Sequence, residues 1–168
     1  MMSQTGYQRS EHAYTMPDVK LVGMDGAETS LFAELSTDKP LLVNFVFTTC
    51  TTICPVMTGV LSQVQKGLGP EAANVRMISF SIDPEYDTPE RLREYAERFK
   101  AGPEWRFFTG DPQEIIAVQR AFENYRGNKM NHPPVTLLRR SAGEPWVRLD
   151  GIARAAEVIA EYHRLVHR

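Results

Sequence analysis

Hydrophobic and polar residues follow two different spacings along this chain. An almost unbroken apolar run at residues 41–47 (LLVNFVF) is typical of a strand that is covered on both faces of a sheet. After it, apolar residues from Val56 to Leu68 recur every three or four positions, as in an amphipathic helix. The same two spacings predict an N-terminal hairpin (18–23 and 29–31), three strands (41–47, 75–82 and 105–109), three helices (55–68, 88–100 and 111–125), a closing hairpin (135–139 and 146–149) and a final helix (152–166).

Strands that alternate with helices in this way predict an α/β protein whose central mixed sheet is flanked by helices on both faces. The first central strand, 41–47, runs into two cysteines and then into a helix, which is the thioredoxin-like arrangement. We therefore expect a thioredoxin-like fold with an N-terminal β-hairpin extension. A single domain is expected over residues 16–168, and residues 1–15 are expected to be a flexible lead-in, such as a removed leader or anchor leaves behind.

Length and composition narrow the class of protein. A chain of 168 residues, with 24% charged residues and a formal net charge of −2, fits one globular domain. No basic stripe with interleaved aromatic residues is present, so nucleic-acid binding is not expected. No apolar run approaches the ~20 residues of a membrane span. Membrane association is therefore expected only through a segment that is absent from this chain.

The chemistry concentrates at Cys50 and Cys54, which are the only two cysteines. Their CxxxC spacing differs from the redox CxxC motif, and one turn of chain brings their Cα atoms to roughly 5–6.5 Å, a separation that a disulfide allows. Pro55 suits the first turn of a helix, where free N–H groups and the helix dipole favour a thiolate at Cys54. The two thiols can thus form a redox pair or share one metal ion. The alternative is that both are inert core residues.

The natural third ligand for a shared metal is His132, which precedes the predicted strand 135–139. Two thiolates and one imidazole suit Cu(I), and a weak further ligand would allow Cu(II). Structural zinc normally takes four protein ligands, and calcium and magnesium prefer oxygen. The two prolines that follow His132 stiffen its loop. Taken alone, however, His132 would be an ordinary loop histidine.

Asp83 lies at the end of the predicted strand 75–82, and so at the same edge of the sheet as the cysteines. There it would contact the metal ligands or bind the metal weakly through oxygen. The alternative is a turn aspartate before Pro84, and the sequence leaves the two interpretations open.

Four stretches stand out together: residues 44–55 (NFVFTTCTTICP), 79–92 (SFSIDPEYDTPERL), 105–110 (WRFFTG) and His132 ahead of a strand. In combination they resemble the Sco/SenC family of copper-binding cytochrome c oxidase assembly proteins. Two departures concern Thr51, where many members have proline, and the context of His132, which many members place after an acidic residue and before serine or threonine.

The resemblance implies a thioredoxin-like monomer in the periplasm or elsewhere outside the cytoplasm, often tethered by a membrane anchor. It implies one copper ion per chain, held by Cys50, Cys54 and His132. The implied partner is the copper-bearing subunit of cytochrome c oxidase, or another copper chaperone. The implied role is to deliver copper to the binuclear site of the oxidase, or to reduce the cysteines of that site before loading.

Two other functions use the same cysteines. A thiol-disulfide oxidoreductase without obligatory metal would reduce partner cysteines by mixed-disulfide exchange, and His132 would then be dispensable. A peroxidase-like thiol enzyme would need a reactive, low-pKa Cys50, with some support from Thr49 beside it at the end of the strand.

Overall fold

The computed structural model describes residues 6–50, 53–129 and 133–167. None of the described helices is long and apolar enough to cross a membrane. The elements are β1 (Tyr7–His12), β2 (Lys20–Gly23), β3 (Glu28–Ser30), α1 (Leu31–Leu35), β4 (Leu41–Val46), α2 (Ile53–Leu68), η1 (Gly69–Asn74), β5 (Arg76–Ser81), α3 (Pro89–Arg98), β6 (Trp105–Thr109), α4 (Pro112–Ala121), β7 (Val135–Arg139), β8 (Trp146–Gly151) and α5 (Ala155–Val166).

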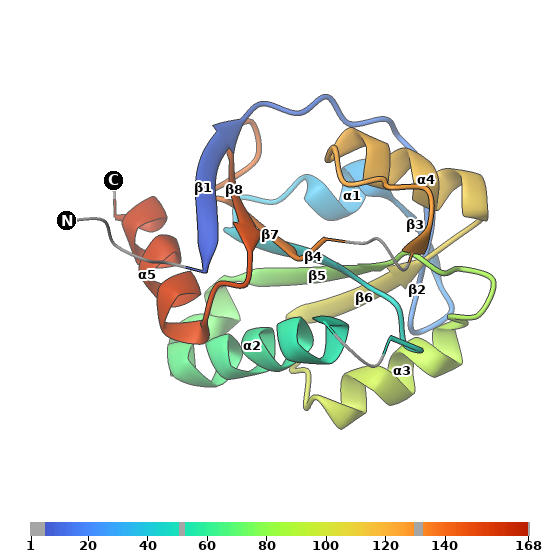
Figure 1. The fold of residues 1–168 in the computed structure, drawn as a ribbon, viewed down its shortest axis with the longest axis horizontal. Coiled ribbons are helices and arrows are strands. Elements are labelled where there is room, and N and C mark those ends of the chain that lie inside the picture. The colour runs from blue at the N-terminus through green and yellow to red at the C-terminus, as the bar shows by residue number, and fades with distance from the viewer. Residues whose placement is uncertain (1–5, 51–52, 130–132, 168) are drawn as a thin grey trace.

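The strands of the described residues form one mixed sheet in the order β1-β8-β7-β4-β5-β6-β2-β3. β4, β5 and β6 run parallel, whereas the other neighbours pair antiparallel. In Figure 1, α2 and α3 lie below the sheet, α5 lies at its left end, and α1 and α4 lie above it. Residues of α5 pack into the same apolar cluster as those of α2 and α3. The predicted central mixed sheet with helices on both faces is confirmed, and so is the N-terminal hairpin, which adds β2 and β3 beyond β6.

Each face of the sheet has its own core because alternate residues of a strand point to opposite faces. Leu42 of β4 packs into the cluster that includes α2, α3 and α5. Its neighbours Leu41 and Val43 pack into the second cluster, which includes α1 and α4. This double coverage explains why all six residues of β4 are buried, as the apolar run predicted.

The expectation of a flexible lead-in over residues 1–15 does not hold for residues 7–12, which form β1. This strand pairs antiparallel with β8, from Tyr7 opposite Gly151 to His12 opposite Trp146. Its sequence, YQRSEH, lacks apolar alternation, so the hydrophobic pattern gave no signal. Backbone pairing holds it at the sheet edge. The short helix α1 also escaped the pattern; Ser30 caps it by accepting a hydrogen bond from the N–H of Ala33.

Candidate metal centre

The two cysteines lie where β4 passes into α2. After the strand, the N–H of Cys50 donates to the carbonyl of Phe47 at 3.1 Å, which turns the chain back. The N–H of Cys54, in the first turn of α2, donates to the Sγ of Cys50 at 3.3 Å. Both cysteines are in the thiol form and are not joined by a disulfide. The chain thus brings the two sulfur donors together at the carboxyl end of the sheet, as the sequence predicted.

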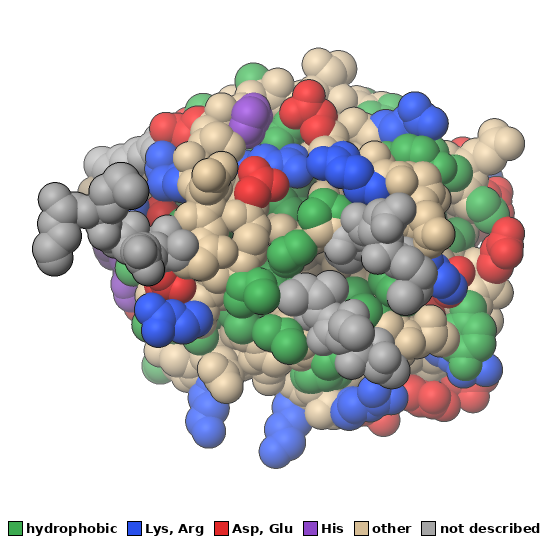
Figure 2. Space-filling model, viewed as in Figure 1, with side chains coloured by type: hydrophobic (Ala, Val, Ile, Leu, Met, Phe, Trp, Pro, Cys, Tyr) green, Lys and Arg blue, Asp and Glu red, His purple; other side chains and the backbone are tan. Residues whose placement is uncertain are grey.

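The cysteine pair is buried in a small apolar cluster of its own. Cys50 is 8% exposed and Cys54 is 1% exposed, and both pack with Phe47 and the half-buried Ile82. Figure 2 shows hydrophobic side chains in the middle of the face that carries α2, with basic side chains around its margin. The thiols therefore lie in an apolar environment.

Burial changes the acidity that the sequence predicted for Cys54. Burial, together with a hydrogen bond to the Cys50 side chain, raises the pKa of the Cys54 thiol to about 12, and a backbone hydrogen bond at Phe47 partly opposes the shift. The expectation that Cys54 would ionise easily is wrong, because desolvation of the buried thiolate is the largest cause of the raised pKa.

A buried carboxylate below the cysteine loop was missed from the sequence. Asp87 is fully buried and accepts hydrogen bonds from the N–H of Thr48 at 3.2 Å, the hydroxyl of Thr48, and the hydroxyl of Ser81 at 2.8 Å. Burial raises the pKa of Asp87, although these hydrogen bonds oppose the shift. The motif at residues 79–92 contains Asp87, but its Asp-Thr-Pro context predicted only the start of a helix.

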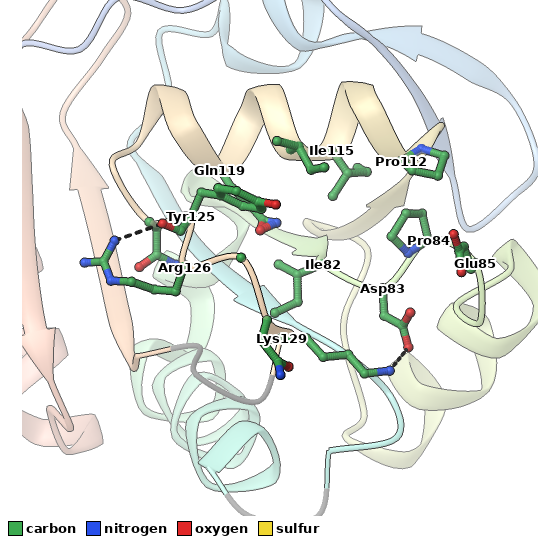
Figure 3. Close-up of a pocket in the computed structure, with 14 residues that line it drawn as sticks. Ile82, Asp83, Pro84, Glu85, Pro112, Ile115, Gln119, Tyr125, Arg126 and Lys129 are labelled. Atoms are coloured by element: carbon green, nitrogen blue, oxygen red, sulfur yellow. Dashed lines mark hydrogen bonds and ion pairs between the residues drawn. The ribbon is translucent and has the colours of Figure 1, made fainter.

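Asp83 lies at the sheet edge as predicted, and the structure pairs it with a lysine. Its Oδ2 is 2.6 Å from the Nζ of Lys129, an ion pair drawn in Figure 3. The same Nζ lies 5.4 Å from the centre of the Phe47 ring. A metal ligand role for Asp83 would have to compete with Lys129, which the sequence did not anticipate.

His132 lies outside the described residues, so its predicted role as a ligand stays a prediction. In the described part of the chain, no group of three or more His, Cys, Asp and Glu side chains is arranged to hold a metal ion. The histidines that are described belong to other elements. His12 of β1 stacks on Tyr14, and His163 of α5 pairs with Glu71.

A cavity of about 500 Å³ opens beside the Asp83–Lys129 ion pair. It lies between the turn after β5, helix α4 and the segment that follows α4 (Figure 3). Its lining is apolar at Ile82 and Ile115 and polar at Gln119 and Asn128. Since Ile82 also packs against the cysteines, the cavity and the thiol pair are neighbours.

The central strand of the mixed sheet leads to two cysteines that contact each other at the start of a helix. This arrangement defines a thiol protein of thioredoxin-like architecture. The chain belongs to the SCO1/SenC family, whose family model matches residues 8–167. The SCO1 protein homolog of Bacillus subtilis (strain 168) is 38% identical over 104 residues, which is 61% of this chain and 53% of the relative. The chain thus spans about half the length of this curated relative.

Two solved structures of the family align over nearly the whole chain. BsSco, a member of the Sco family of cytochrome c oxidase assembly proteins with a disulfide switch, has a TM-score of 0.77 and 27% identity, covering 94% of this chain and 96% of its own. ScoI of Bradyrhizobium japonicum with copper bound has a TM-score of 0.70 and 26% identity, covering 89% and 98%. These likenesses confirm the predicted thioredoxin-like fold and the resemblance to the Sco/SenC family.

Proposed function

We propose that this protein holds one copper ion with Cys50, Cys54 and His132 and helps to load the binuclear copper site of a cytochrome c oxidase. The observation that carries the proposal is the contact between the two cysteines, where the Cys54 N–H lies 3.3 Å from the Cys50 Sγ. The side chains of the two cysteines also share a hydrogen bond, so one metal ion could bind both sulfurs. Sulfur donors in an apolar setting favour Cu(I) over harder ions.

Copper would take the place of the thiol protons. Burial disfavours a bare thiolate at Cys54, so copper binding has to release protons as the sulfurs become ligands. A third donor is needed, and the position of Lys129 supports His132 in this role. Lys129, three residues before it, contacts the Phe47 ring that packs against both cysteines.

The family supports copper as the cargo and the oxidase as the destination. ScoI of Bradyrhizobium japonicum binds copper, and BsSco belongs to a family of oxidase assembly proteins. By the same reasoning we propose that the protein works as a monomer outside the cytoplasm, with the copper-bearing subunit of the oxidase or another copper chaperone as its partner.

The test is an anaerobic copper titration of the reduced protein, followed by spectroscopy. The wild type should bind one Cu(I), Cys50→Ala and Cys54→Ala should each abolish tight binding, and His132→Ala should weaken it. Proton release on binding should accompany the titration. Wild-type affinity in either cysteine variant would reject the proposal, and wild-type affinity in His132→Ala would remove this histidine from the ligand set.

The same contact between the two cysteines favours a second function, the reduction of partner disulfides. Cys50 is the more exposed of the two and would attack the partner, and Cys54 would then close the Cys50–Cys54 disulfide. The partner thereby gains two electrons and two protons. His132→Ala separates the two functions, because it should lower copper affinity and leave the dithiol midpoint potential unchanged. If His132→Ala left both the copper affinity and the dithiol potential unchanged, the result would fit disulfide reduction, for which His132 is dispensable.

A further inference from the structure

We propose that Lys129 is a positioning residue of the copper centre, and that its contacts with Asp83 and Phe47 hold the segment that leads into His132 against the cysteine loop. The inference rests on the proposed function, since it concerns the same copper site. It assigns a role to a residue that neither the ligand prediction nor the sequence motifs contain.

Lys129 joins three parts of the chain through one side chain. Its Nζ pairs with Asp83 Oδ2 at 2.6 Å, in the turn that follows β5. The same Nζ lies 5.4 Å from the centre of the Phe47 ring, just beyond β4. Figure 3 shows Lys129 extending from the segment after α4 toward Asp83. The segment is thus tied to the turn after β5 and to the base of the cysteine loop.

Both points of attachment are themselves fixed. The N–H of Asp83 donates to Ser81 Oγ at 3.1 Å, and the Asp83 carbonyl accepts from the N–H of Asp87 at 2.8 Å. Phe47 is 3% exposed and packs against both cysteines. Because Asp83 and Phe47 are each held by their own contacts, their interactions with Lys129 constrain the lysine and the chain around it.

Residues 124–129 face a cavity on their inner side, so few packing contacts hold them there. The contacts of Lys129 with Asp83 and Phe47, which we call the tether, are therefore important for holding this segment. Residues 124–129 line the cavity of about 500 Å³ that separates them from α4 and from the turn after β5. Within the segment, the N–H of Asn128 bonds to the carbonyl of Arg126, and Arg126 bonds to the carbonyls of Glu123 and Tyr125. These local bonds shape the segment, and Lys129 fastens it across the cavity.

Chain geometry connects this tether to the copper ligand. Three residues span at most about 10 Å, so a fixed Lys129 limits how far His132 can lie from the cysteine loop. Without the tether, copper binding would have to order the segment at the cost of its conformational entropy. Loss of such a supporting contact typically lowers metal affinity by about 10–100-fold. Because the ion pair is half exposed, we expect the lower end of that range, about tenfold.

The variants are Lys129→Met, which keeps the length of the side chain, and Lys129→Arg, which keeps its charge. The chain offers a matched control in Lys39→Met. Lys39 pairs with Glu104 at 2.9 Å, and its side chain is 40% exposed, compared with 38% for Lys129. Lys39 lies at the opposite, amino-terminal end of β4 and also donates to the Ala73 carbonyl at 3.1 Å, so its removal tests the loss of a comparable surface contact away from the cysteines.

Cu(I) affinity is measured anaerobically by competition with a chelator, together with the nitrogen hyperfine signal of the Cu(II) form and the dithiol midpoint potential. Lys129→Met should bind Cu(I) about tenfold more weakly with a reduced imidazole signal and an unchanged dithiol potential. Lys129→Arg should recover most of the affinity, and Lys39→Met should match the wild type. In the His132→Ala background, Lys129→Met should add no further loss, because the lysine acts through the histidine.

Three results would overturn the role of Lys129: wild-type copper binding in Lys129→Met, no recovery in Lys129→Arg, or an additive loss in the double variant. A wild-type protein that binds no copper would instead reject the proposed function, and the inference with it. Wild-type copper binding that persists in Lys129→Met rejects only the inference.

Discussion

Asp87 lies beneath the cysteine loop and accepts hydrogen bonds from both the backbone N–H and the hydroxyl of Thr48. Thr48 is two residues before Cys50, so this pair of bonds fixes the backbone just before the first thiol. The same carboxylate accepts from Ser81 at the end of β5. One fully buried side chain therefore joins the two central strands at the point where the thiols emerge.

Asp87→Ala should destabilise the protein by about 2–3 kcal/mol, because it leaves the donors of Thr48 and Ser81 unpaired in a buried place. The measurement is urea denaturation of the reduced protein. Asp111→Ala is the control, since Asp111 is an exposed aspartate whose side chain makes no capping hydrogen bond. Equal free energies of unfolding for the two variants would contradict a structural role for Asp87.

The acidity of Asp87 should be visible in the pH dependence of stability. Burial raises its pKa in the folded protein, so the native state holds this proton more tightly than the unfolded chain does. Between the folded pKa and the unfolded value of about 4, wild-type stability should therefore rise as the pH falls. Asp87→Asn lacks this contribution.

The difference in unfolding free energy between wild type and Asp87→Asn should thus shift in favour of the wild type as the pH is lowered from 7 to about 4.5. Asp38→Asn, at an exposed position, controls for the loss of one negative charge. A wild-type advantage that grows as the pH rises would mean that the folded pKa of Asp87 is lowered and not raised.

Cys54 should remain a thiol well above neutral pH. With a folded pKa of about 12, its thiolate fraction grows about tenfold per pH unit between pH 7 and 10. Alkylation of Cys54 in a Cys50→Ser variant should follow this slope without reaching a plateau, because desolvation is the main cause of the shift and survives the substitution. In urea the same thiol should level off above about pH 9.

Slow alkylation alone would not test this prediction, because Cys54 is only 1% exposed and access is also restricted. The slope separates the two causes. Restricted access lowers the rate by the same factor at every pH, whereas a raised pKa extends the rise to higher pH. A native-state plateau between pH 8 and 9 would contradict a raised pKa.

The sequence predicted the core of the fold because apolar spacing reports directly on burial. The run at residues 41–47 could hardly form anything but a strand covered on both faces, and β4 is such a strand. The pairing of Cys50 and Cys54 followed from the same reasoning, since a strand followed by a helix leaves them one turn of chain apart.

The parts that failed depend on contacts between residues far apart in sequence. The helix dipole at Cys54 is a local property, but its desolvation depends on how Phe47 and Ile82 cover it. Asp87 is 39 residues from Thr48, and nothing local distinguishes a buried carboxylate from an ordinary turn aspartate. Lys129 was hidden for the same reason, because its partner Asp83 is 46 residues away.

Strand β1 could not be predicted from the sequence for a different reason. It is held by backbone pairing and by one buried acid on α5, and neither produces an apolar pattern. Glu161 is 5% exposed and accepts hydrogen bonds from the Tyr7 hydroxyl at 2.8 Å and from Arg9 Nε at 3.1 Å. Burial, together with the hydrogen bond to Glu161, raises the pKa of Tyr7 to about 12. Tyr7 therefore donates its proton to this bond throughout the physiological pH range.

Glu161→Ala should release β1 from α5, because it removes the shared acceptor of Tyr7 and Arg9. We expect amide hydrogen exchange at residues 7–12 to speed up at least tenfold, and the free energy of unfolding to fall by about 1–3 kcal/mol. Arg164→Ala is the control: Arg164 pairs with Glu161 at 2.9 Å, but its side chain is 63% exposed, so its removal should cost little. If exchange at residues 7–12 were the same in the two variants, backbone pairing with β8 alone would account for the strand.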